Sequence, residues 1–201
     1  MTYPYLVLQP GKNVLVSHYE RGRWQESLFY RYGERQSTGE KIMEWRGMRR
    51  FKQQVSEQEC LEVLKKEKRG VLALHGENGY PYALPLNFYY DEEDGKVYFH
   101  GTREGNKIDL LKKDDRVSFC VCTQGFQKEG DWAYNPTSVI IRGRIAVIQD
   151  SEQVRKQCRN LGMKYYPTEE SVDEVMRKTS GRVCILALTI DYMTGKLVHE
   201  S

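Results

Sequence analysis

The feature that most constrains the fold is a long segment rich in β-branched and other apolar residues, Pro136–Gln149. Such a composition, with apolar positions recurring along it, is typical of a β-strand. Gly143 lies near its middle, and a glycine inside a strand favours a bend or the close approach of another backbone. The sequence therefore predicts one long strand that bends near its centre.

Shorter segments with strand patterns precede and follow it. They are Val71–His75, Tyr82–Tyr90, Lys96–His100, Arg116–Thr123 and Val183–Asp191. Pro85 interrupts the second of them, and because proline lacks an N–H it restricts that stretch to a sheet edge or a bulge. Short turns between these segments favour antiparallel pairing. Six strands, one of them long and bent, predict closure into a small barrel.

Helices are expected to flank this barrel. They are Glu57–Lys68, Asn106–Lys113, Ser151–Leu161 and Ser171–Lys178. The S-x-x-E pattern of a capping box occurs at Ser56–Glu59 and again at Ser171–Glu174. Gln124–Asn135 is expected as a loop, and Tyr192–Leu197 as a turn.

The first 47 residues differ in character from the rest. Tyr5–Leu8 and Val14–Ser17 are expected as short strands with a turn between them. Arg21–Gly47 has little periodicity, which leaves open either a β-hairpin with a tail or a segment without order. We therefore expect a weakly structured extension, residues 1–47, and a domain over residues 48–201. A start codon placed too far upstream would produce the same pattern.

The charge pattern excludes some partners. The chain has 31 basic and 28 acidic residues, a formal net charge of +3, and its lysines and arginines are scattered. A nucleic-acid partner requires clustered basic residues. No apolar run is long enough to cross a membrane. We expect neither kind of partner.

The five cysteines and four histidines form no recognisable metal or disulfide pattern. The odd number of cysteines and the absence of a C-x-x-C pair indicate a reduced protein. Cys120 and Cys122 share one face of an expected strand, where they would pack in the core or at an interface. The histidines and cysteines lack metal-ligand spacing, and residues 1–10 lack the pattern of a signal peptide. We expect a cytoplasmic protein without a metal site.

One stretch, Lys96–Val117, combines a strand, a glycine-containing turn and a helix. Gly101 and Gly105 permit the turn, and Lys107 lies in the first turn of the helix. The unpaired N–H groups and the positive dipole end of a helix start favour an anion, whereas a lysine there is mildly unfavourable unless an anion is present. A bound phosphate would account for both features. On these residues alone, an ordinary strand–turn–helix with a solvated lysine explains them more simply.

Five short motifs occur in a fixed order along the chain. They are P-Y-A-L-P-L-N-F-Y-Y-D at Pro81–Asp91, V-Y-F-H-G-T at Val97–Thr102, G-N-K at Gly105–Lys107, S-V-I-I-R-G-R at Ser138–Arg144, and R-K-T-S with I-D-Y-M-T-G-K at Arg177–Ser180 and Ile190–Lys196. With these motifs, residues 48–201 resemble the pyridoxamine 5′-phosphate oxidase-like, FMN-binding split-barrel superfamily. Within it, they are most similar to the branch of the 5-nitroimidazole resistance (Nim) proteins.

The resemblance implies a fold and an assembly. The fold is mainly β with flanking helices, a six-stranded antiparallel split β-barrel. Two copies of the chain would form a homodimer that holds FMN at the subunit interface. A small-molecule substrate would meet the flavin there.

The same resemblance assigns the site residues. The strand whose backbone would lie along the flavin ring consists of Ala83, Leu84, Pro85, Leu86, Asn87 and Phe88. His100 and Gly101 would lie near the flavin ring. Asn106 and Lys107 would hold the phosphate, and Ser138 and Val139 would approach the flavin from the long strand.

Two departures from the family pattern bear on the activity. Many relatives have a second basic residue where this chain has Asn106, so the phosphate would rely more on backbone N–H groups. Many pyridoxamine phosphate oxidases have an arginine where this chain has Ala83. Their C-terminal residues for the substrate phosphate are not recognisable here either. These departures argue against vitamin B6 oxidation.

The resemblance therefore implies an FMN-dependent oxidoreductase that reduces a small oxidised aromatic compound such as a nitroimidazole, with NAD(P)H as electron donor. His100 would be the catalytic residue, since imidazole titrates near neutral pH and can deliver a proton. A structural role for His100 stays open, as does a flavin- or haem-binding protein without turnover. Trp132 and Tyr134 would form either a lid over the flavin or part of an exposed loop.

Overall fold

The computed structural model describes residues 14–20, 23–30, 45–179 and 183–198. By its internal contacts the chain divides into two compact units, Met1–Glu44 and Trp45–Ser201. Among the described residues, the second unit holds the large sheet and the four α-helices.

The first unit contains a β-hairpin. Its strands, β1 (Val14–Glu20) and β2 (Arg23–Tyr30), pair antiparallel. The expected strand Val14–Ser17 falls within β1, whereas the expected strand Tyr5–Leu8 lies outside the described residues. The division into an extension over residues 1–47 and a domain after it stays a prediction.

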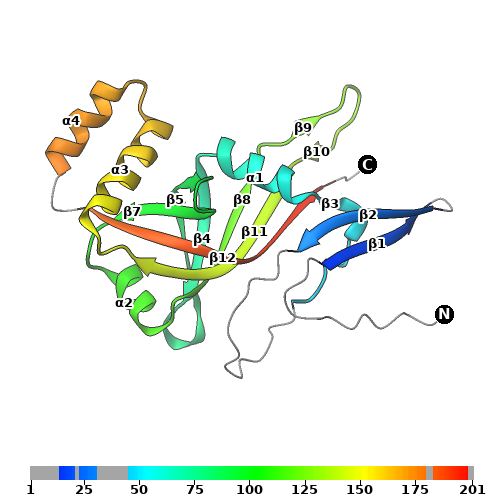
Figure 1. The fold of residues 1–201 in the computed structure, drawn as a ribbon, viewed down its shortest axis with the longest axis horizontal. Helices are drawn as coiled ribbons and strands as arrows, with labels where there is room; N and C mark the ends of the chain where they lie inside the picture. The colour runs from blue at the N-terminus through cyan, green and yellow to red at the C-terminus, as the bar shows by residue number, and fades with distance from the viewer. Residues whose placement is uncertain (1–13, 21–22, 31–44, 180–182, 199–201) are drawn as a thin grey trace. The chain divides into compact units, whose positions relative to one another are not determined.

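The second unit is built on one curled antiparallel sheet (Figure 1). The strand order is β5–β4–β8–β11–β12–β7–β6, with β3 paired to the end of β12. The strands are β3 (Gln54–Val55), β4 (Arg69–His75), β5 (Pro81–Asn87), β6 (Tyr89–Asp91), β7 (Lys96–Gly101), β8 (Arg116–Cys122), β11 (Thr137–Val147) and β12 (Cys184–Leu197). The two end strands, β5 and β6, follow each other in the chain, as in a barrel that is split. The expected mainly β split-barrel fold with flanking helices is confirmed.

All six expected strands are present, and the described sheet has eight because of two short additions. The stretch expected as one strand, Tyr82–Tyr90, is divided at Phe88 into β5 and β6, because the backbone of Phe88 bonds to the Tyr165 hydroxyl. The other addition, β3, has only two residues and is too short to show a sequence pattern. Pro85 lies in an edge strand, as expected, since β5 pairs only with β4.

Gly143 marks a bulge between β11 and β12. The pairing register shifts between Arg142 and Gly143. A Cβ atom on Gly143 would overlap the carbonyl oxygen of Thr189, so only glycine lets the two backbones come this close. The close approach predicted at this glycine is confirmed.

The turn expected at Tyr192–Leu197 is wrong, because β12 continues through Leu197 and stays paired with β11. Gly195 lies within this stretch. In the structure its missing side chain leaves the space that the Cys60 Sγ and the Val55 side chain occupy, so this glycine serves packing against the sheet.

The helices are α1 (Glu57–Lys66), α2 (Asn106–Lys113), α3 (Ser151–Tyr165) and α4 (Glu169–Thr179). The capping box at Ser56 is confirmed: its hydroxyl accepts from the Glu59 N–H at 3.2 Å, and its N–H donates to the Glu59 carboxylate at 2.8 Å. This helix ends two residues earlier than expected, because Glu67 is already extended. No helix in the described ranges is long and apolar enough to span a membrane.

The boundaries of α3 and α4 also differ from expectation. α3 continues past Leu161, because Gly162 lets the helix pack closely on Val172 of α4. α4 starts at Glu169, where the Thr168 hydroxyl accepts from the Ser171 N–H at 3.3 Å. The capping box expected at Ser171 is therefore wrong, and Thr168 takes the cap position.

The two faces of the sheet are covered differently. The inner face forms the main core. At its centre the Phe119 ring makes T-shaped contacts with the rings of Phe88 and Phe99, with ring centroids 5.1 and 5.0 Å apart. On the outer face, α3 packs over β7 and β12 around the buried Tyr98. Side chains alternate along a strand, so His100 lies on the same outer face as Tyr98.

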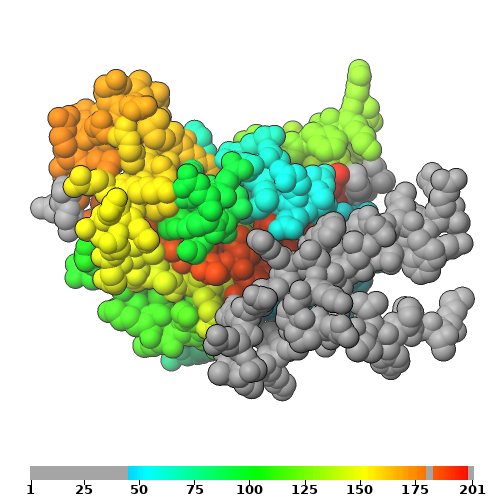
Figure 2. Space-filling model, viewed as in Figure 1, coloured from blue at the N-terminus to red at the C-terminus, as the bar shows by residue number. Residues whose placement is uncertain are grey.

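The stretch expected as a loop, Gln124–Asn135, contains a short hairpin. Its strands are β9 (Phe126–Gln127) and β10 (Tyr134–Asn135). The hairpin projects from the body of the second unit (Figure 2). The Trp132 and Tyr134 side chains on it are 76% and 57% exposed, and a lid role for them stays a prediction.

Candidate functional site

The edge strand β5 carries most of the residues expected along a flavin ring. Leu84 and Leu86 pack on the core, whereas Ala83 and Pro85 are exposed on the outer face. Because proline has no N–H, the nitrogen of Pro85 faces away from β4, and the direction of main-chain groups alternates along a strand. Ala83 and Asn87 therefore also present their N–H and C=O groups to the open edge. Such an edge offers hydrogen-bonding groups to a flat polar ring.

Phe88, the last residue of the expected set, is held inside the protein. Its ring is fully buried in the core. Its N–H donates to the Tyr165 hydroxyl at 2.8 Å, and its carbonyl accepts from the same hydroxyl at 2.9 Å. Phe88 thus anchors the end of β5, and Tyr165 is a positioning residue that no sequence pattern indicated.

Three expected residues come together at the end of β7. A Cβ atom on Gly101 would lie 2.9 Å from Lys107 Nζ, so the ammonium group rests against the glycine backbone. His100 precedes this glycine. Partial burial and the charge of Lys107 both lower the pKa of His100. Glycine at position 101 is what allows the lysine of α2 to reach the strand.

The Lys107 ammonium has no carboxylate partner among the described residues. Its side chain is half-buried, and this burial lowers the pKa of Lys107, an effect that the neighbouring Cys184 opposes. A partly desolvated cation without a counter-charge is unfavourable. A bound anion would relieve that cost.

The start of α2 has free donors next to this ammonium. Gly105 precedes the helix with φ of +107°, a conformation that favours glycine, and it provides no side-chain cap. Its carbonyl accepts from the N–H groups of Ile108 and Asp109. The N–H groups of Asn106 and Lys107 come before the first helical bond. These donors and the Lys107 ammonium are the kind of set that holds a phosphate.

The last expected pair lies elsewhere in the chain. Val139 is fully buried in the core, whereas Ser138 is half-buried and pairs with Cys122. His100 of β7 pairs with Ile185 at the start of β12, and the Ile185 carbonyl accepts from the Ile148 N–H. His100 is therefore level with the C-terminal end of β11, next to Ile148. Ser138 precedes Ile148 by ten residues of nearly continuous strand, roughly 30 Å along the chain. A single copy of the chain does not bring Ser138 together with His100.

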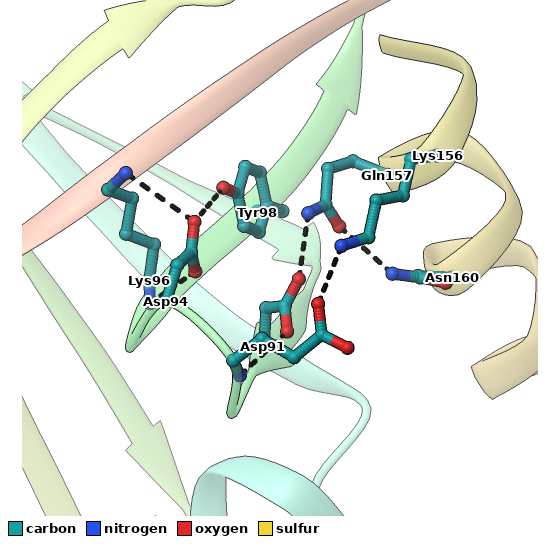
Figure 3. Close-up of polar contacts among 8 residues, drawn as sticks. Asp91, Asp94, Lys96, Tyr98, Lys156, Gln157 and Asn160 are labelled. Atoms are coloured by element: carbon teal, nitrogen blue, oxygen red, sulfur yellow. Dashed lines mark hydrogen bonds and ion pairs between the residues drawn. The ribbon is translucent and has the colours of Figure 1, made fainter. Parts of the chain in front are cut away.

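A second polar cluster lies on the same face of β7 and ties the β6–β7 turn to α3 (Figure 3). Gln157 Nε2 donates to Asp91 Oδ2 at 2.7 Å, and both side chains are buried. The Tyr98 hydroxyl donates to Asp94. Burial and this carboxylate raise the pKa of Tyr98. At the rim, Lys156 pairs with Glu93. The buried polar groups here are partnered, which identifies the cluster as structural.

A groove beside the expected site was not predicted. Its volume is about 850 Å³, and it lies between α3, α4 and the turn after β7, where Arg103 lines it. Arg103 could have been noticed in the sequence, because it lies in the turn between an expected strand and an expected helix.

An aromatic cluster on β11 and β12 was also missed. The rings of Trp45 and Tyr192 stack at 5.3 Å, and the Arg142 guanidinium lies 5.2 Å from the first and 5.9 Å from the second. Trp45 falls within the first 47 residues, so the end of the expected extension packs against the domain.

The cysteines and His75 were not predicted as site residues, and among them Cys184 neighbours Lys107. All five cysteines are free thiols. Cys120 and Cys122 share a face as expected, the former half-buried and the latter exposed. His75 is exposed, with Nε2 3.9 Å from Asp114. Within the described ranges, no three His, Cys, Asp or Glu side chains gather as a metal site.

Known proteins with this fold include flavin-binding members. A putative 5-nitroimidazole antibiotic resistance protein from Bacteroides thetaiotaomicron is 22% identical, with a TM-score of 0.59 over 72% of this chain and 86% of that one. An FAD-binding protein from Mesorhizobium loti is 22% identical, with a TM-score of 0.53 over 73% and 97%. An FAD and haem binding protein from Mycobacterium smegmatis is 21% identical, with a TM-score of 0.59 over 73% and 74%. At these identities the likeness establishes the fold.

A search of curated proteins gave no match. The sequence model of the family described as pyridoxamine 5′-phosphate oxidase matches residues 56–197, which include β4 to β12 and all four helices. The chain therefore belongs to the pyridoxamine 5′-phosphate oxidase family.

Proposed function

We propose that this protein is a flavin-dependent oxidoreductase that reduces a small oxidised aromatic compound such as a nitroimidazole. FMN is the proposed flavin and NAD(P)H the proposed electron donor. The observation that carries the proposal is the half-buried Lys107 ammonium, which lacks a carboxylate partner in the described ranges and lies beside the uncapped start of α2 and His100. Family membership supports a flavin cofactor in general.

The residues at this place fit a flavin phosphate. Lys107 and the N–H groups of Asn106 and Lys107 would hold it, because each is a donor without an acceptor of its own in the helix. The main-chain groups of Ala83 and Asn87 on the open edge of β5 would orient the ring. When bound, the flavin supplies hydride transfer, which no side chain can provide.

His100 is the proposed proton donor. Reducing a nitro group to a nitroso group takes up two electrons and two protons and releases one water. Hydride accounts for two electrons and one proton, so the second proton has to come from the protein or from solvent. The His100 imidazole can hold that proton at the strand end, and its exposed side chain can be reprotonated by solvent.

A homodimer is part of the proposal. In one chain, Ser138 and His100 lie level with opposite ends of β12, which supports a site made from two copies. The outer face of β5, β4, β8 and β11 offers a surface for this contact. Register places Pro85, Val71, Cys120 and Ile140 in one row across it, and Val71 and Ile140 are 44% and 43% exposed. Changing Ile140 to Glu should convert the dimer to monomers in analytical ultracentrifugation.

The experiment that tests the function starts with the visible spectrum of the purified protein and a titration with FMN. Flavin bands, tight FMN binding and bleaching of the bound flavin by NADH or NADPH are expected. Reoxidation by a panel of nitroaromatic and quinone acceptors then identifies the substrate class. A Soret band would show that the protein binds haem in place of flavin. Flavin binding without turnover of any acceptor would leave a carrier or sensor.

A further inference from the structure

The groove between α3, α4 and the turn after β7 has the size and chemistry of a binding site. Its volume of about 850 Å³ is within the range of small-molecule sites. One wall is apolar, formed by Val154, Cys158, Met176 and Val183, all half-buried. The other side carries arginines. Figure 1 shows α3 and α4 side by side at the end of the sheet where β7 terminates.

The groove has an excess of positive charge. Arg103, Arg155 and Arg177 line it, and none of them has an ion pair among the residues that the structure describes. A fourth arginine, Arg159, is neutralised by Glu169 and Asp173. The remaining acidic residue of the lining, Glu170, lies in the first turn of α4, where its carboxylate interacts with Thr168 and with its own N–H.

The groove adjoins the proposed flavin phosphate site. Arg103 lies three residues after His100 and four before Lys107, on the turn that joins β7 to α2. The start of α3 also lines the groove at Ser151, and the dipole of a helix start favours a phosphate, although the cap carboxylate of Asp150 lies at the same end. A ligand with two phosphates could reach from Lys107 past Arg103 into the groove.

We propose that this groove binds the adenosine phosphate half of a dinucleotide, with phosphates on Arg103, Arg155 and Arg177 and the adenosine against the apolar wall. The proposal extends the proposed flavin function and rests on it. Two molecules carry this chemistry: FAD, bound as the cofactor in place of FMN, and NADPH, bound as the electron donor.

The direct test uses ADP as the probe with the full-length protein. ADP binding is measured by isothermal titration calorimetry for the wild type, for Arg155→Gln and for the double variant Arg155→Gln, Arg177→Gln. Each lost arginine should weaken ADP binding about tenfold. The matched control is Lys178→Gln. Lys178 follows Arg177 on α4 but is paired with Glu174 and lies outside the groove lining, so this variant should leave ADP affinity unchanged. Absence of ADP binding, or equal affinities in wild type and double variant, overturns the proposal.

A second set of titrations identifies the molecule. Tighter binding of FAD than of FMN, lost in the double variant, assigns the groove to the cofactor. Equal FAD and FMN affinities with NADPH binding to the FMN-loaded protein, lost in the double variant, assign it to the electron donor. If neither dinucleotide gains affinity from the two arginines, the dinucleotide assignment is wrong. FMN binding is read separately from ADP binding, so a failure of the flavin function and a failure of the groove are distinguishable.

Discussion

The outer face of β7 carries two polar clusters, centred on residues two positions apart, and they differ in how their charges are satisfied. At Tyr98 the buried groups are partnered: its hydroxyl donates to Asp94, and the neighbouring Asp91 accepts from Gln157. At His100 the neighbouring charge is the Lys107 ammonium, which is half-buried and has no carboxylate partner among the described residues.

This difference separates a structural cluster from a binding site. Buried polar groups are costly unless they are hydrogen-bonded, so a protein normally partners them. The Tyr98 cluster follows that rule and fixes α3 to the sheet. The His100 cluster leaves a cation for an external anion to satisfy. The predictions below test whether the first cluster carries stability and the second carries ligand binding.

Removing the central carboxylate of the structural cluster should give the largest effect. Asp91→Ala leaves the Gln157 amide and the Glu93 N–H without their acceptor. The free energy of unfolding, from urea titration, should fall by about 3 kcal/mol. Glu93→Ala, which removes only an exposed ion pair with Lys156, should cost less than about 1 kcal/mol. A loss from Asp91→Ala as small as that from Glu93→Ala would contradict the structural assignment.

Removing the imidazole should affect chemistry and not stability. His100→Ala should slow nitroaromatic reduction about 100-fold, the lower end for a general acid, because solvent can replace an exposed donor. FMN affinity should stay within about twofold of the wild type. His75→Ala is the control, since this histidine is also exposed and lies outside the cluster. A wild-type rate in His100→Ala would return His100 to a structural role.

Removing the lysine should affect binding alone. Lys107→Ala should weaken FMN binding by about 2 kcal/mol, the value of a charge-assisted phosphate contact. The free energy of unfolding without FMN should not fall, because no protein partner is lost. Lys112→Ala on the same helix removes an exposed lysine paired with Asp109 and should leave FMN affinity unchanged. Fluorescence quenching of FMN measures both variants. Equal affinities would remove Lys107 from the site.

A methyl group at position 101 should have a smaller effect of the same kind. Gly101→Ala places a Cβ 2.9 Å from Lys107 Nζ, and the flexible lysine has to move away. FMN binding should weaken by about 1 kcal/mol, with little change in unfolding. Combining Gly101→Ala with Lys107→Ala should add nothing further, because the methyl group acts through the lysine. Additive losses would show that Gly101 contacts the ligand directly.

An effect of similarly small size concerns Lys164, a half-buried lysine that does have partners. It donates to the Leu64 carbonyl at 3.0 Å and lies 4.1 Å from the centre of the Phe88 ring. Burial lowers its pKa to about 8. Between pH 8 and the unfolded pKa near 10.4 the unfolded chain binds more protons, so stability should rise with pH, on the order of 1 kcal/mol after screening. Urea titrations of Lys164→Met should show this rise abolished. An unchanged rise would assign it to another group.

Local patterns predicted the strands well and their ends less well. The six strands follow from apolar alternation and from Gly143, whose missing side chain the β11–β12 bulge requires. The turn expected at Tyr192–Leu197 was wrong, and its Gly195 makes room for Cys60 and Val55, a role that the sequence does not distinguish from that of a glycine in a turn. Tyr165 could not be predicted at all, since its bonds to Phe88 join residues 77 positions apart.

The sequence by itself determined the barrel, the helix start at Asn106 and the presence of a lysine and a histidine near the same turn. Periodicity, glycine and capping signals are local, so they are readable one element at a time. Only the tertiary structure decided that Lys107 folds back over Gly101 beside His100, that Ser138 lies at the far end of β11, and that Arg103 opens onto a groove of arginines. These relations depend on how separate elements pack, and packing brings together residues that no local pattern connects.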